Sequence, residues 1–503
     1  MGNFNPMLVT FTVYLITVLL IGIAAYYATH NFGDYILGGR KLGGFVTGMS
    51  AGASDMSGWL LMGLPGAVYA AGLCEIWIAI GLTVGAYLNW IFVSGRLRTH
   101  TEFNNNALTL PEYFANRFGG EHDKALKVIS ATIILFFFTI YCSSGVVAGA
   151  RLFENLFNLS YTQAMLLGAG ATIAYTFIGG FLAVSWTDTI QASLMFIALC
   201  ITPVFLIITI GGFSEISAEI NAASAAQNIN YGSLFTGTSL LGIISAAAWG
   251  LGYFGQPHIL ARFMAAESVP ALKKARRFSI IWMILCLAGT CAIGYCGIAY
   301  FHKFPAEVAV LDGNPERIFI AFAKILFNPW IAGVLLSAIL AAIMSTLSCQ
   351  LLVCSSAITE DFYKGFLRPD AEQKELVWVG RLMVLAVAVV AIILAADPNN
   401  SVMKLVNYAW GGFGAAFGPI VLLSVLWSKL TAKGALAGMI VGAVTVVIWK
   451  QLDTGLYEIV PGFIACGLVA IVISSVGKVP EAVVEKFQTA DKVYKQESGK
   501  ITA

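Results

Sequence analysis

Long apolar blocks separated by short polar breaks run along almost the whole chain. A helix needs about 20 apolar residues to cross a bilayer, so the pattern predicts about thirteen transmembrane helices. They are expected at residues 6–27, 44–72, 76–95, 125–150, 161–180, 189–211, 234–258, 276–301, 317–350, 377–396, 402–427, 434–451 and 457–477. The block at 317–350 is too long for a straight crossing, so we expect it to tilt or to extend beyond the hydrocarbon. The predicted fold class is an all-α integral membrane protein.

Positive charges orient these helices. With the N-terminus outside, the segments on the cytoplasmic side carry 23 of the 29 Lys and Arg residues, as the positive-inside rule requires. The first block has no preceding positive residue and no cleavage pattern, so it is expected to stay as the first span. We therefore expect a multi-pass protein of the cytoplasmic (inner) membrane, with one transmembrane domain over 1–477 and a cytoplasmic tail over 478–503.

Composition excludes several other classes. Only 11% of the 503 residues are charged, against roughly 25% in soluble domains, and the net charge of +2 gives no field for nucleic acid. The nine cysteines nearly all lie in apolar blocks without a CxxC pair, so neither a disulfide scaffold nor a zinc site is indicated. The five histidines are scattered rather than grouped with acids, as a membrane enzyme would require. We expect no catalytic residue, no cofactor and no obligate protein partner.

Two of the predicted spans contain sequences that break helices. Residues 50–59 read SAGASDMSGW, and residues 249–258 read WGLGYFGQPH. A membrane helix can be interrupted only where protein or a water-filled cavity covers the freed backbone groups, and transporters place solute and ion sites at such breaks. The two breaks occupy matching places if the chain holds two five-helix halves, at 44–211 and 234–427. Close helix packing by small residues is the alternative explanation for the second break.

Polar side chains within the apolar blocks mark a candidate ion path. Asp55 lies in the first break, where an ionisable residue indicates a functional site. Ala342, Ser345 and Thr346 offer a carbonyl and two hydroxyl oxygens, which suit a hard cation such as sodium, although the hydroxyls could instead bond to their own helix. Asp188 could cap the helix that follows it or serve as a gate or ion exit.

Two longer segments resemble the sodium:solute symporter family. They are YTFIGGFLAVSWTD at 175–188 and LAAIMST at 340–346. Within the family, the similarity is greatest to members that carry L-proline, and it extends over nearly the whole chain. The pieces that carry it are Asp34 to Arg40, Ser50 to Ala67, Asn104 to Leu110, Trp249 to Phe263 and Ser345 to Thr359.

The resemblance implies a sodium site and its access route. Backbone oxygens would come from Ala53, Met56 and Ala342, and hydroxyls from Ser345 and Thr346. Asp55 would be needed for sodium use, and Asp188 would help sodium pass to the cytoplasm. Arg40, which could otherwise be a topology charge, would belong to the inner gate.

The resemblance also implies a solute site and a fold. Ser57 and Gly58 would line the site for L-proline. Its ring would be covered by Tyr141, Trp249, Tyr253 and Pro257. The implied fold is a five-plus-five inverted repeat of spans 2–6 and 7–11, with one extra helix before it and two after.

Other transport functions remain open at this point. A family member could carry another small solute, such as pantothenate, a sugar or a monocarboxylate. Proton coupling would leave only Asp55 to titrate, because the cluster at 342–346 is neutral. A channel would need a continuous charged or carbonyl-lined pore, and the sequence has no ring-forming repeat to build one.

Overall fold

The computed structural model describes residues 5–118, 120 and 122–499. Within these ranges, ten helices are long and apolar enough to cross a membrane. They span Pro6–Ala28, Leu73–Phe103, Asp123–Phe157, Gly180–Ile210, Val269–Lys303, Pro329–Leu367, Gln373–Leu394, Val402–Leu426, Ala432–Gln451 and Ile459–Val476. The described chain is therefore all-helical and multi-pass, apart from an isolated parallel bridge between Leu42 and Ala266.

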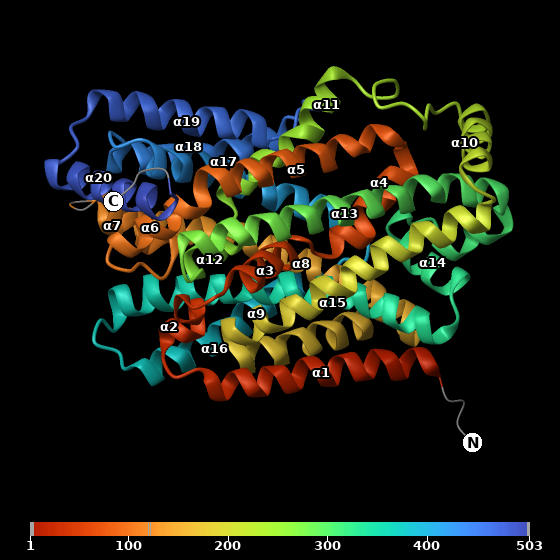
Figure 1. Ribbon diagram of the computed structural model, residues 1–503, viewed down its shortest axis with the longest axis horizontal. Helices are drawn as coiled ribbons and strands as arrows, with labels where there is room; N and C mark the ends of the chain where they lie inside the picture. The colour runs from red at the N-terminus through yellow and green to blue at the C-terminus, as the bar shows by residue number, and fades with distance from the viewer. Residues whose placement is uncertain (1–4, 119, 121, 500–503) are drawn as a thin grey trace.

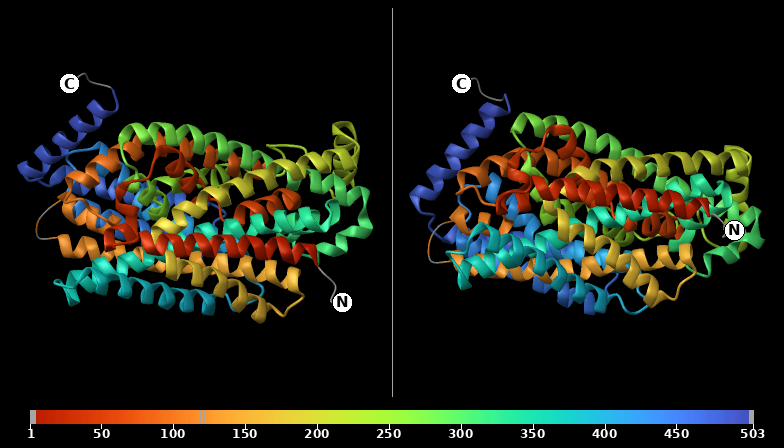
Figure 2. Two further views of the ribbon diagram at one scale, coloured as in Figure 1. Left: turned by 60° about the horizontal axis from the view of Figure 1, so that its bottom comes forward. Right: turned by 90° about the horizontal axis from the view of Figure 1, so that it is seen from below.

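Most of the long helices run roughly along the long axis of the molecule (Figure 1). Helix α1 (Pro6–Ala28) begins at one end, whereas α20 (Glu481–Glu497) lies at the other, beside α6 (Gly95–Phe103) and α7 (Leu110–Phe118). Helices α10 (Phe213–Gln227) and α14 (Ile318–Leu326) lie at the end where α1 begins, and two further views agree (Figure 2).

The other long helices form the body of the bundle. They are α5 (Ile76–Asn89), α8 (Asp123–Phe157), α9 (Tyr161–Ile210), α13 (Val269–Lys303), α15 (Pro329–Ser356), α16 (Gln373–Leu394), α17 (Val402–Leu426), α18 (Ala432–Gln451) and α19 (Ile459–Val476). Short segments connect them: α2 (Phe32–Leu37), η1 (Gly38–Arg40), η3 (Leu73–Glu75), η4 (Trp90–Ser94), η6 (Pro305–Leu311), η7 (Pro315–Arg317) and η8 (Ala357–Leu367). Of the ten long apolar helices, the one that begins with α15 is the most buried, and α15 packs against α1, α8 and α9.

The first predicted interruption is present. Helix α3 (Gly44–Asp55) ends at Asp55, and Met56 leaves the helical conformation with a ψ of 82°. After residues 56–58 the chain resumes as η2 (Trp59–Gly63) and α4 (Leu64–Ala71). The serines of this segment favour such a break because their side chains compete for backbone hydrogen bonds.

The second predicted interruption is also present. Helix α11 (Leu240–Ala247) tightens into the 3-10 segment η5 (Ala248–Gly255), and α12 (Pro257–Ala265) follows. Gln256 between them is extended, with a ψ of 107°, as expected before a proline. Close backbone approach fixes this segment, because a Cβ on Gly85 of α5 would lie 2.1 Å from the carbonyl oxygen of Gly250.

The long predicted span at 317–350 is wrong as a single helix. The structure divides it into α14 and α15, separated by Phe327 and Asn328. The Asn328 side chain accepts hydrogen bonds from the backbone N–H groups of Trp330 and Ile331, each at 3.1 Å. Asn followed by Pro329 is an N-cap followed by a first-turn proline, so the membrane span begins at Pro329 and continues to Leu367.

The predicted link at 181–188 is also wrong. Helix α9 runs through this segment, and its backbone departs from helical geometry at Gly180, where φ is 60°. Asp188 therefore lies two turns inside a helix and cannot cap its N-terminus. The count of thirteen spans is not confirmed. The ten long apolar helices within the described residues leave out the two interrupted spans and the segment before Gly180.

Most of the tail forms helix α20, which is docked against the bundle. Its Ala490 is completely buried, and the Arg96 guanidinium of α6 lies 4.6 Å from the centre of the Tyr494 ring. The guanidinium of Arg117 on α7 lies 4.9 Å from the Phe487 ring. The tail helix therefore covers the ends of α6 and α7.

Candidate functional site

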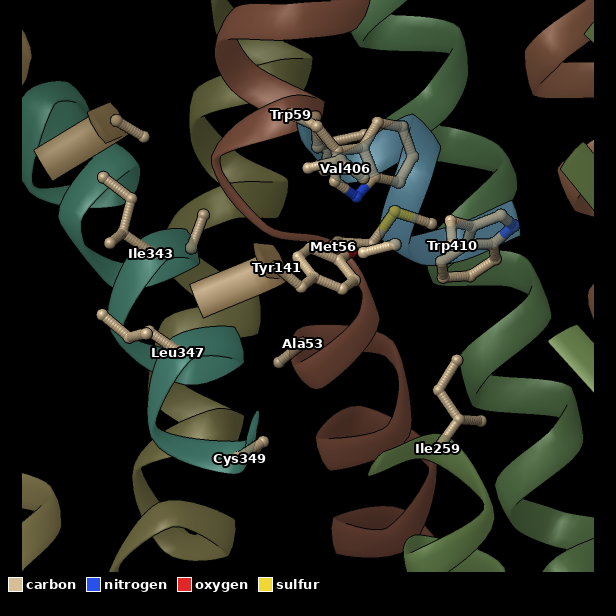
Figure 3. Packing of buried hydrophobic residues seen from close by; sticks show 14 of the residues in the cluster. Ala53, Met56, Trp59, Tyr141, Ile259, Ile343, Leu347, Cys349, Val406 and Trp410 are labelled. Carbon is tan, nitrogen blue, oxygen red and sulfur yellow. The ribbon is translucent and has the colours of Figure 1, made fainter. Parts of the chain in front are cut away.

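The break after α3 lies beside the middle of α15. The Ser345 hydroxyl donates to the carbonyl oxygen of Ala53 at 2.8 Å and to that of Ala342 at 3.1 Å. The Thr346 hydroxyl reaches the Ala53 carbonyl at 3.4 Å. Figure 3 shows Ala53 on the side of α3 that faces α15, with Met56 at the break above it. The structure thus brings four of the five predicted sodium ligands into contact, and Met56 is buried within the same break.

This cluster consists of neutral oxygens. Its hydroxyls and carbonyls are the ligand type that hard cations prefer. Among the described residues, no group of three or more His, Cys, Asp or Glu side chains is placed to hold a metal ion. Each hydroxyl can rotate and turn its lone pairs toward an ion, so the contacts within the cluster can be exchanged for contacts to a cation.

Asp55 joins the two interrupted helices. The hydroxyl of Tyr253, in η5, donates to the Asp55 carboxylate, and the Trp59 indole N–H donates to the Asp55 backbone carbonyl at 3.2 Å. The second carboxylate oxygen is buried without a hydrogen-bond partner. A buried carboxylate oxygen without a partner costs free energy in an apolar surrounding. A further hydrogen-bond donor or a nearby cation would therefore stabilise it.

Aromatic rings surround the break in η5. The Trp249 ring lies 6.3 Å from that of Trp59 and stacks on that of Trp410 at 6.2 Å. The Trp410 indole N–H donates to the Trp249 carbonyl at 2.7 Å, and the Tyr253 ring meets Trp410 edge-on at 5.1 Å. Trp410 was not among the predicted site residues, although the run from Trp410 to Phe413 in α17 (WGGF) repeats the Trp-Gly chemistry of the break.

Three further residues predicted to bind solute lie at or beside the other break, after α3. Ser57 and Gly58 are buried between η2 and its neighbours, and a Cβ on Gly58 would lie 2.9 Å from Ala148 of α8. Tyr141 is buried beside the break (Figure 3), with its hydroxyl free of hydrogen bonds and its ring 6.1 Å from that of His258.

Pro257 and Trp249 line two different cavities, on opposite sides of the break at η5. Pro257 lines a cavity of about 30 Å³ together with Arg262, which is space for about one water molecule. Trp249 lines a cavity of about 370 Å³ on its other side. Neither cavity is lined by Ser57 or Gly58. Packed side chains therefore separate the break after α3 from both cavities.

Asp188 is fully buried and forms part of an ion pair. It accepts a hydrogen bond from Ser50 at 2.5 Å, and Arg262 of α12 lies 3.6 Å away. The same guanidinium donates to Ser50 at 3.2 Å and to the His258 carbonyl at 3.1 Å. Sequence reasoning missed Arg262 because it was counted only as a topology charge.

Arg40 connects three segments at the end of the bundle that carries α20. Its guanidinium donates to the Met264 carbonyl at 2.8 Å, to the Ala107 carbonyl at 2.5 Å and to the Thr101 hydroxyl at 3.1 Å. Burial, reinforced by the charge of Arg98, lowers the pKa of Arg40 to about 10. These hydrogen bonds hold the C-terminal end of α12 beside α6.

Residues 35–442 match the Sodium:solute symporter family. The chain belongs to this family, as its sequence motifs indicated. Curated relatives cover nearly the full length. A "Sodium/proline symporter" of Haemophilus influenzae is 62% identical over 99% of this chain and 100% of the relative. A protein of the same name from Escherichia coli is 63% identical over 97% of each chain.

More distant comparisons agree with this assignment. The "Osmoregulated proline transporter OpuE" of Bacillus subtilis is 49% identical over 97% of this chain and 99% of its own. The solved structure of a Na+-coupled sialic acid symporter in a substrate-bound outward-open state superimposes with a TM-score of 0.80. It covers 94% of this chain and 98% of that chain at 18% identity, so this last likeness concerns the fold.

Proposed function

We propose that this protein imports L-proline together with sodium by alternating access. The observation that carries the proposal is the contact of Ser345 and Thr346 with the Ala53 carbonyl, which joins the interrupted α3 to α15 through neutral oxygens. The names of the full-length relatives supply the solute and the coupling ion.

Sodium would bind within this cluster. The carbonyls of Ala53, Met56 and Ala342 and the hydroxyls of Ser345 and Thr346 would replace its hydration shell. Since both sides of the cluster contribute ligands, bound sodium fastens α3 to α15. A ligand shifts a conformational equilibrium only by its differential affinity for the two states, and a site built from two helices has that property.

Proline would bind in the adjoining break. Its carboxylate can be received by the Ser57 hydroxyl and the backbone N–H group of Gly58, while its secondary ammonium donates two hydrogen bonds. Its apolar ring would be enclosed by aromatic faces, which Tyr141, Trp249 and Tyr253 supply beside Pro257. The Tyr253 hydroxyl on Asp55 would then couple the solute site to the end of α3 that holds the ion.

The inner side would open by separation of two charged contacts. Asp188 paired with Arg262 lies below the ion cluster, and Arg40 ties α12 to α6. Release of the Asp188 carboxylate from Arg262 would offer sodium a counter-charge on its way to the cytoplasm, and movement of Arg40 would free α12.

We further propose the domain organisation and topology that this mechanism needs. A single transporter domain, 1–477, would hold two inverted repeats at 44–211 and 234–427, followed by the tail. The protein would lie in the cytoplasmic membrane with its N-terminus outside and its C-terminus inside. Helix α1 begins at one end of the bundle and the tail helix α20 lies at the other (Figure 1). This arrangement supports an odd number of crossings.

The driving force is sufficient for accumulation. One charge moving through 100 mV supplies about 2.3 kcal/mol, and a tenfold sodium gradient adds about 1.4 kcal/mol. Their sum supports a proline gradient of some hundreds-fold.

Uptake of labelled proline into proteoliposomes tests the function directly. We expect accumulation with an inward sodium gradient, little uptake when potassium replaces sodium, and no competition from pantothenate, sugars or monocarboxylates. Strong competition by one of these solutes would identify a different cargo. Accumulation driven by a pH gradient without sodium would contradict sodium coupling.

A further inference from the structure

A cavity lined by charged side chains, called the vestibule below, lies beside Trp249 of η5. It is the cavity of about 370 Å³ that Trp249 lines, between α5, α11 and the loop from α18 to α19. Small-molecule sites commonly have volumes of about 300–1,000 Å³. The predicted orientation places this loop outside the membrane, so the vestibule lies on the path of a solute that approaches Trp249 from the external solution.

The vestibule holds a positive and a negative group side by side. The Lys450 ammonium, at the end of α18, lies 3.6 Å from the Glu458 carboxylate at the start of α19. This separation is longer than a hydrogen bond. Glu458 is only 5% exposed, and its oxygen that faces Lys450, Oε1, is buried without a hydrogen-bond partner. A buried carboxylate left in this way retains the capacity to accept a strong hydrogen bond.

Aromatic and backbone contacts hold the rest of the vestibule in place. The Tyr457 ring lies 5.8 Å from that of Trp249, and the Tyr457 hydroxyl donates to the Asn407 carbonyl at 2.7 Å. The Trp449 indole N–H fixes the loop by donating to the Leu456 carbonyl at 3.2 Å. An apolar floor therefore lies below the charged pair.

We propose that this vestibule is an outer binding station for the zwitterionic amino acid, with Glu458 accepting its ammonium and Lys450 donating to its carboxylate. The inference rests on the proposed function and adds a site where the substrate is held before it passes Trp249. No covalent step is involved, because the solute exchanges one set of hydrogen bonds for another.

A zwitterion fits this site better than an ion of either sign. It carries both charges on neighbouring groups, as the Lys450–Glu458 pair does, so it can insert between them and satisfy both. The carboxylates of Glu75 and Asp453 also line the cavity, which disfavours a simple anion. A simple cation would leave Lys450 without its counter-charge. The aromatic floor offers an apolar surface to the ring of a cyclic amino acid.

Transport kinetics of two variants test the proposal. Glu458→Gln keeps the shape of the side chain and removes its charge, and Lys450→Met removes the ammonium. In right-side-out membrane vesicles, each should raise the KM for proline by roughly tenfold, the factor of about one charge-assisted hydrogen bond. The maximal rate and the sodium concentration for half-activation should stay within about twofold of the wild type. Lys404→Met, which removes an exposed lysine of α17 outside the vestibule, is the matched control and should leave the KM unchanged.

Each result decides for or against the station. A KM unchanged in both variants would overturn it. Parallel loss of maximal rate and thermal stability would assign the pair a structural role, and a shift confined to sodium activation would make the vestibule a cation site; both results would overturn the proposal. If wild-type protein fails to take up proline with sodium, the proposed function itself is wrong, which is a separate outcome.

Discussion

Replacing Arg262 with methionine is expected to destabilise the protein severely, because it leaves Asp188 buried without its cation. Both side chains are almost fully buried, at 1% and 0% exposure, and lie 3.6 Å apart. Removing one partner of a buried ion pair typically costs about 3–5 kcal/mol of unfolding free energy. The lost hydrogen bonds from Arg262 to Ser50 and to the His258 carbonyl contribute to this cost.

A double-mutant cycle measures the pairing itself. In Arg262→Met/Asp188→Asn the uncompensated charge is gone, so we expect most of the lost stability to return, with a coupling free energy of at least about 1.5 kcal/mol. Unfolding free energies of the purified variants can be measured by denaturant titration in mixed micelles.

A second buried arginine provides the control for this cycle. Arg381 packs over the ring of Tyr26 at 4.8 Å, without an ion pair to a carboxylate within the described part of the chain. Arg381→Met combined with Asp188→Asn should therefore be additive. Additive losses in the Arg262 cycle as well would refute the conclusion that Arg262 compensates Asp188.

Three further predictions concern other parts of the structure. In Gly252→Ala the new Cβ would lie 1.9 Å from the indole nitrogen of Trp410, so uptake should fall more than about tenfold while membrane insertion persists; normal uptake would contradict this packing. Phe487→Ala removes the ring beside the Arg117 guanidinium, so limited proteolysis should cleave the tail faster than in the wild type. Burial raises the pKa of Glu112 above 4.5. The stability that the protonated Glu112 carboxyl contributes is therefore lost as pH rises through the raised value. In Glu112→Gln, the thermal stability measured against pH should decline less over this range.

The sequence was most informative where the covalent chain itself restricts the backbone. The glycines and serines between Ser50 and Gly58 and the Gly-Pro pattern up to Pro257 interrupt helices for local reasons, and both breaks could be predicted. Neighbouring hydroxyls at Ser345 and Thr346 predicted an oxygen cluster, although their contact with Ala53 depends on how α3 packs against α15.

Partners separated by long stretches of sequence could not be predicted in the same way. Arg262 meets Asp188 because α12 packs against α3, which packs in turn against α9, and no spacing in the chain encodes that contact. Trp410 supports the η5 break from α17 for the same reason. The misplaced start of α15 has a different cause, since the cap formed by Asn328 before Pro329 is a local signal that lies inside an otherwise continuous apolar run.

The sodium dependence of proline uptake in Ser345→Ala/Thr346→Ala tests the central claim most directly. If neutral oxygens between α3 and α15 hold the coupling ion, the double variant should insert normally but need about a hundredfold more sodium for half-activation, the effect of about 1.4 kcal/mol for each lost hydroxyl ligand. Half-activation at the wild-type sodium concentration would contradict the account.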